Sequence, residues 1–208
     1  MVAKLEGGCV VTDLREGEIR GDKVSLRGIN VRGKRTLFNE SAEEVLYVID
    51  GSGTADGRGI AVDSGIYLPP QTSLELKGDM TLVSVRGGEG AAAPLSNDGI
   101  TITSLHDQPL QRTGDRSYRE LIQQQVTQFV GTIPPGRAPN HHHLYEEVIY
   151  ILDGEGVMWA GETNAPVATG ACIYLPRKQT HCLENKGTTD LKLLGVFYPA
   201  GSPAVRYT

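Results

Sequence analysis

Four of the five histidines in this chain lie in two short segments. His141, His142 and His143 are consecutive, and His181 follows later in the chain. In an extended strand, alternate side chains point to the same face, so His141 and His143 share a face and His142 points to the other. Glu147 has the same parity as His143, and a bent strand or hairpin brings its carboxylate beside the imidazoles. Borderline divalent metals bind such ligands, and the set leaves coordination positions open. The pattern predicts a metal site.

Two simpler interpretations compete with the metal site. A purification tag does not fit, because the histidine run is internal and is followed by an apolar segment. His181 alone is more typical of a structural, hydrogen-bonded histidine than of a ligand. Its surroundings favour a ligand, since Gly170 to Asn185 reads as a buried strand, a proline stop at Pro176, a turn and a second alternating run.

Two groups of residues resemble the two motifs of the cupin family. The first consists of Gly136, His141, His143, Glu147 and Gly154, and the second consists of Gly170, Pro176, His181 and Asn185. Two departures occur: the interval from Gly136 to His141 is one residue shorter than usual, and Lys178 replaces the usual glycine. The resemblance implies that His141, His143, Glu147 and His181 ligate one divalent transition metal per chain, with Fe, Mn, Ni, Zn and Cu as alternatives.

The chain also repeats itself after about a hundred residues. The segment 43–53 recurs as 146–156, and Ile66-Tyr-Leu-Pro recurs as Ile173-Tyr-Leu-Pro. The chain therefore resembles a bicupin, an all-β protein with two tandem cupin barrels of jelly-roll type. We expect an N-terminal barrel at 1–88, a linker at 89–99 and a C-terminal barrel with the metal site at 100–208.

The two copies differ at the positions of the metal motif. Alignment places Phe38 opposite His141, Glu40 opposite His143 and Glu44 opposite Glu147, and the first hundred residues contain no histidine. Ser73 or Leu74 aligns with His181. Glu40 and Glu44 are compatible with a hard cation, but two carboxylates on one strand more often form a solvated edge. We expect a metal-free, structural N-terminal barrel.

Composition agrees with a compact β protein. The 26 glycines and 11 prolines separate short Val, Ile, Leu and Tyr runs, and dipeptides such as Asp50-Gly51 and Asp153-Gly154 are turn signals. This pattern is typical of a jelly roll. One segment is ambiguous: residues 115–125 fit either a helix or the beginning of an alternating strand.

Charge and cysteine content narrow the partners and the compartment. The formal net charge is −5 and basic residues are scattered, which argues against nucleic acid and against an anionic membrane surface. No apolar run is long enough for a bilayer, and no signal-peptide pattern is present. The three cysteines have no framework spacing, which is typical of reduced thiols. We expect a cytoplasmic protein that binds a small-molecule substrate or ligand, and the cupin resemblance implies a homodimer.

Three functions are compatible with such a site. The resemblance implies first a metal-dependent oxidoreductase of dioxygenase type. The alternatives are a non-redox isomerase, hydrolase or decarboxylase acting on a sugar acid or similar molecule, and a non-catalytic cupin that binds a small ligand. Parity predicts an apolar wall of Ile149, Ile151 and Leu183 around the metal. Candidate rim residues are Tyr145, Trp159, Tyr174, Arg177 and Gln179.

Overall fold

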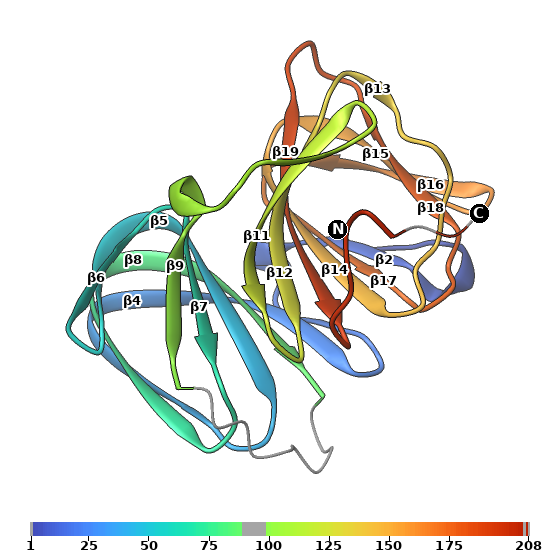
Figure 1. Cartoon of the computed structure of the whole chain (residues 1–208). Helices are drawn as coiled ribbons and strands as arrows, with labels where there is room; N and C mark the ends of the chain where they lie inside the picture. Colours follow the sequence, from blue (N-terminus) through green and yellow to red (C-terminus); the bar gives the residue numbers. More distant parts are fainter. Residues whose placement is uncertain (1, 89–98, 206, 208) are drawn as a thin grey trace.

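The computed structural model describes residues 2–88, 99–205 and 207, and this part of the chain is almost entirely β (Figure 1). Three short 3-10 turns, η1 (Glu6–Gly8), η2 (Leu14–Glu16) and η3 (Leu105–Asp107), are the helical elements among these residues. The expected all-β class is therefore confirmed. The expected linker lies outside the described residues, except for Gly99.

One sheet of seven strands forms what we call the N-terminal unit. In spatial order, its strands are β3 (Ile19–Arg20), β4 (Val24–Asn39), β8 (Thr72–Gly87), β5 (Glu43–Ala55), β7 (Ser64–Leu68) and β9 (Thr101–Ser104), and β6 (Arg58–Ala61) pairs with β5. β4 and β8 pair along sixteen residues each, and the bent strands wrap around a single apolar interior.

Two further sheets form what we call the C-terminal unit. The larger sheet has the order β1 (Ala3–Lys4), β2 (Val10–Asp13), β17 (Ala171–Leu175), β14 (Glu146–Asp153), β19 (Leu191–Tyr198), β12 (Thr127–Ile133), β11 (Arg116–Gln123) and β10 (Gln111–Thr113). The smaller sheet has the order β13 (Gly136–Arg137), β18 (His181–Asn185), β15 (Glu155–Ala160) and β16 (Thr163–Ala168). Every strand pairing in these sheets is antiparallel.

The sheets exchange strands across the boundaries expected from the sequence. β2 pairs with β17, so residues near the start of the chain extend the sheet of the C-terminal unit (Figure 1). β9 lies beyond the expected linker but pairs with β7 of the N-terminal unit. The ranges 1–88 and 100–208 therefore do not coincide with the sheets, and as domain boundaries they stay a prediction.

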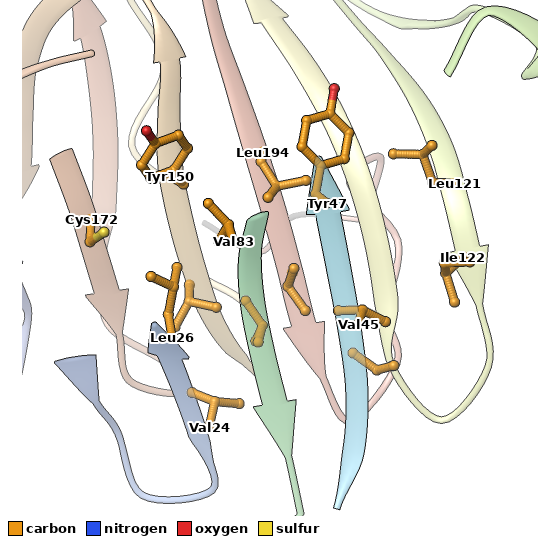
Figure 2. Close-up of a cluster of buried hydrophobic side chains, with 14 of the residues drawn as sticks. Val24, Leu26, Val45, Tyr47, Val83, Leu121, Ile122, Tyr150, Cys172 and Leu194 are labelled. Atoms are coloured by element: carbon orange, nitrogen blue, oxygen red, sulfur yellow. The ribbon is translucent and has the colours of Figure 1, made fainter. Parts of the chain in front are cut away.

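Three apolar clusters hold the molecule together. One fills the N-terminal unit, and another lies between the two sheets of the C-terminal unit. The third lies between the units, where Val45, Tyr47 and Val83 meet residues such as Tyr150 and Leu194 (Figure 2). Alternation explains this arrangement, because odd residues of β5 face the other unit and even residues such as Leu46 face the interior.

The structure decides between helix and strand for the segment that the sequence left ambiguous. Residues 116–123 form strand β11 and not a helix, because the segment pairs with β12 and buries Tyr118, Leu121 and Ile122. The part of the chain that the structure describes contains no helix with the length and hydropathy needed to span a bilayer.

Candidate metal site

The backbone aligns two histidines that are distant in sequence. His141 and His181 form an isolated antiparallel bridge, in which each N–H donates to the other's carbonyl oxygen at 3.0 and 2.8 Å. Residues paired in this way project their side chains to the same face. Because His143 lies two residues after His141, it shares that face, as the sequence predicted.

The three imidazoles converge between the two sheets of the C-terminal unit. Ring centroids are separated by 5.0 Å for His141 and His143, 4.4 Å for His141 and His181, and 5.5 Å for His143 and His181. One nitrogen from each ring lies within 4.8 Å of the others, a spacing at which one ion contacts all three. His142 points elsewhere, and its ring stacks on Tyr207.

Backbone carbonyls orient each of the three rings. Nδ1 of His141 lies 3.0 Å from the Pro139 oxygen, Nδ1 of His143 lies 3.1 Å from the Val205 oxygen, and Nδ1 of His181 lies 2.8 Å from the Gln179 oxygen. A carbonyl only accepts, so each Nδ1 carries the proton and each Nε2 keeps its lone pair. This is the arrangement that prepares a histidine for a metal.

Glu147 projects into the same space from β14. Its Oε2 lies 3.7 Å from His143 Nε2 and 3.5 Å from His181 Nε2. The side chain is buried, and among the described residues Oε2 has no hydrogen-bond partner. A buried carboxylate oxygen is costly without a partner, and a cation at this point removes that cost.

Electrostatics favour a neutral imidazole at His141 and an ionised carboxylate at Glu147. Burial, reinforced by the charge of His181, lowers the pKa of His141 to about 3. Burial on its own raises the pKa of Glu147, but its interactions with His181, His143 and His141 lower it overall. Neutral imidazole and carboxylate are the protonation states in which these groups ligate metals.

A cavity opens directly onto the four side chains. The volume in which the centre of a water molecule fits is about 90 Å³. Ile149, Leu183, Leu193 and Phe197 are among the apolar residues of its wall. The expected wall is confirmed for Ile149 and Leu183, whereas Ile151 packs in the apolar cluster behind it.

The rim residues expected from the sequence do not line this cavity. Tyr145 stacks on the outer side of the His143 ring, and Trp159 lies against Arg137. Tyr174 donates to Glu146, and Arg177 is exposed. Trp159 and Tyr174 occupy other faces of their strands, and Tyr145, Arg177 and Gln179 lie outside the strands.

Polar groups reach the cavity from a segment that sequence reasoning did not select. The lining residues of this kind are Thr113, Arg116, Ser117, Tyr118 and Thr132. Most of them belong to β10 and β11, the region that the sequence left ambiguous between helix and strand. Arg116 and Tyr118 are two residues apart, so an extended strand places both on one face. This spacing is the signal that could have pointed to them from the sequence.

The residues after β19 pack against the site. Tyr145 donates its hydroxyl hydrogen to the Ser202 oxygen at 2.8 Å, and Pro203 lines the cavity. On the other side, Lys178 adopts a left-handed conformation with φ of 63° and donates its N–H to the His143 oxygen at 2.7 Å. The turn between Pro176 and His181 therefore forms without the glycine that the cupin motif has there.

Comparisons with known proteins agree with this geometry. Residues 129–197 match the family model described as Cupin domain. The chain is 38% identical over 66 residues to an oxalate-binding protein of Thermotoga maritima, and 32% identical over 78 residues to an uncharacterized protein of Methanocaldococcus jannaschii. These matches span 31% and 38% of this chain and 54% and 62% of the relatives, so the chain spans less than two thirds of either relative.

The fold is also present in solved structures. Oxalate decarboxylase of Bacillus subtilis, which has Mn(II) centres, superposes with a TM-score of 0.68 at 15% identity, covering 97% of this chain and 76% of that one. At this identity the likeness concerns the fold alone. Together the comparisons support the cupin superfamily.

Proposed function

We propose that His141, His143, Glu147 and His181 hold one divalent transition metal in the C-terminal barrel of a bicupin. The observation that carries this proposal is the buried Oε2 of Glu147, which has no hydrogen-bond partner among the described residues and faces the imidazoles of His143 and His181. The donor set of nitrogens and one carboxylate oxygen suits Fe, Mn, Ni, Zn or Cu. A bound metal supplies a Lewis acid with coordination positions open to a ligand.

The ligand that fits this cavity is a small organic acid. A water molecule needs on the order of 10–15 Å³ on this measure, so about 90 Å³ corresponds to a molecule of roughly six to nine non-hydrogen atoms. Arg116 supplies a guanidinium group in the wall, and guanidinium pairs well with carboxylate. The local similarity to an oxalate-binding protein supports the same ligand class.

The reaction that we favour is a dioxygenase-type oxidation of that acid. Among the described residues that line the cavity, Glu147 is the only carboxylate, and lysine and cysteine are absent. Isomerases, hydrolases and decarboxylases usually need a positioned acid or base, whereas binding and activation at a metal do not. Tyr118 does not supply that base, because its hydroxyl donates to Gln111 at 2.9 Å.

The second candidate is non-catalytic binding of a small dicarboxylate. The observation that favours it is the 38% identity over 66 residues to the oxalate-binding protein. Both candidates use the same metal and the same arginine. They differ in turnover.

Oxygen uptake separates the two candidates. Metal-loaded full chain is mixed with oxalate and with a panel of small carboxylic acids in an oxygen electrode, and binding is followed in parallel by calorimetry. Substrate-dependent uptake that needs the metal supports the dioxygenase-type reaction, and metal-dependent binding without uptake supports the binding protein. Arg116→Gln should weaken binding at least tenfold, while Arg112→Gln, at an exposed position outside the cavity, should not. Equal behaviour of the two variants would contradict the carboxylate assignment.

A further inference from the structure

The described residues that follow β19 run past the candidate metal site. We call residues 200–205 and Tyr207 the strap. At one end, Ala200 donates its N–H to the Gln125 oxygen at 2.9 Å. At the other end, Tyr207 and His142 exchange two backbone hydrogen bonds at 2.8 and 3.1 Å, and their rings stack. The strap is therefore attached next to β12 at one end and to the histidine run at the other.

Two hydroxyl groups hold the middle of the strap. Thr127 donates its hydroxyl hydrogen to the Gly201 oxygen at 2.8 Å and accepts from the Gly201 N–H at 3.2 Å. Tyr145 donates to the Ser202 oxygen at 2.8 Å, and its hydroxyl oxygen also lies 3.4 Å from the Val205 oxygen. Both side chains belong to the C-terminal unit, so they fix how closely the strap lies on that unit.

One candidate ligand takes its orientation from the strap. Nδ1 of His143 donates to the Val205 oxygen at 3.1 Å. The His143 ring also stacks on the Tyr145 ring, with centroids 4.9 Å apart and an interplanar angle of 14°. Tyr145 therefore touches both the ligand and the strap. The rings of His141 and His181, by contrast, have carbonyl partners that lie outside the strap.

The strap has the properties of a segment that opens easily. Its residues are exposed or half-buried, and Val205 and Tyr207 are 45% and 40% exposed. Segments with few buried apolar contacts open at a low cost in free energy, while the sheets beneath them stay folded. Pro203 belongs to the cavity wall, so opening of the strap also removes part of that wall.

We infer that the strap positions His143 for the metal, and that opening of the strap loosens this ligand and uncovers the cavity at the same time. A hydrogen bond to the second ring nitrogen fixes the orientation of a ligating histidine and raises its basicity. Tyr145 is a positioning residue, because it acts through the His143 ring and through the strap. Metal affinity and access of a small ligand are therefore coupled. This inference rests on the proposed metal site.

The double variant Tyr145→Phe/Thr127→Val tests this coupling in the full chain. It removes both hydroxyl groups that hold the strap, but it keeps an aromatic ring on His143 and the shape of both side chains. Calorimetric titration with Co(II) should give an affinity about 10- to 100-fold lower than that of the unmodified chain, which is the loss typical of removing the partner of a ligating histidine. Tyr118→Phe is the matched control, because the Tyr118 hydroxyl donates to Gln111, and its affinity for Co(II) should be unchanged.

A second readout reports on the His143 ring without any metal. The metal-free chain, labelled with ¹⁵N-histidine, should show an Nδ1–H signal protected from exchange with water for each of His141, His143 and His181. The His143 signal is identified by its absence in His143→Ala. In the double variant this signal should be lost through fast exchange. The signals of His141 and His181 should persist, because their carbonyl partners belong to Pro139 and Gln179.

Gly201→Ala carries the test if the double variant does not fold. An added Cβ would lie 2.2 Å from the Tyr145 ring, so it pushes the strap away at a half-buried position. Unchanged Co(II) affinity in a folded variant would overturn the inference, as would persistence of the His143 signal or loss of all three ring signals together. Absence of Co(II) binding by the unmodified chain would instead contradict the proposed metal site, and the His143 signal would then decide the strap contact alone.

Discussion

Residues 100–208 expressed alone should not fold cooperatively, although they contain all four candidate metal ligands. The apolar cluster between the units contains eight described residues before position 100 and eleven after it. Full burial of such side chains contributes about 1.5–3 kcal/mol each. If each of the eleven loses about half of this, the loss is on the order of 10 kcal/mol, which equals the whole stability of a typical domain.

Strand pairing adds to this loss. Without residues 1–99, β17 loses its neighbour β2, with which it pairs from Ala171 to Tyr174. The exposed edge and the uncovered apolar face both favour aggregation.

Thermal unfolding followed by circular dichroism in the presence of added metal is the assay. The control is a co-expressed pair of fragments, 1–88 and 99–208, which keeps every described strand pairing and should melt cooperatively close to the intact chain. A cooperative transition of the fragment 100–208 alone, within a few degrees of the full-length value, would refute the reasoning.

Two further predictions concern packing around the site. Asn185→Ala should lower the free energy of unfolding, measured by chemical denaturation, by about 2–4 kcal/mol, because the buried amide donates to Ile133 and Thr189 and accepts from Gly187. Asn164→Ala, at an exposed position, is the control and should lower it by less than about 0.5 kcal/mol. Equal losses in the two variants would contradict this role of Asn185. Gly195→Ala should lower the free energy of unfolding by about 1–3 kcal/mol and weaken ligand binding measured by calorimetry. The reason is that an added Cβ would lie 2.2 Å from the ring of Phe129, which lines the cavity. Unchanged affinity would show that the ring moves away from the cavity.

Local pattern was sufficient to predict which side chains lie together but not what surrounds them. Parity and the cupin resemblance placed His141, His143, Glu147 and His181 together, because strand alternation is a short-range property. Parity also placed His142 on the opposite face, against Tyr207. Arg116 was missed, because a single residue in an ambiguous segment carries no signal until its strand is paired.

The division of the chain into the ranges 1–88 and 100–208 stays a prediction, and the strand pairings could not be read from the sequence. The repeat identified two units, but it did not show that β2 pairs with β17 or that β9 pairs with β7. Such pairings join segments that are distant in sequence, and backbone hydrogen bonds leave little trace in residue type.

The most direct test of the candidate metal site is the metal content of three proteins purified side by side: the full chain, His142→Ala and His143→Ala. Inductively coupled plasma mass spectrometry should find one equivalent of a divalent transition metal per chain in the first two proteins and a small fraction of that in His143→Ala. Each protein should also show the same far-UV circular dichroism, so that loss of metal is not loss of fold. Stoichiometric metal in folded His143→Ala, or its loss in His142→Ala, would contradict the assignment of the site.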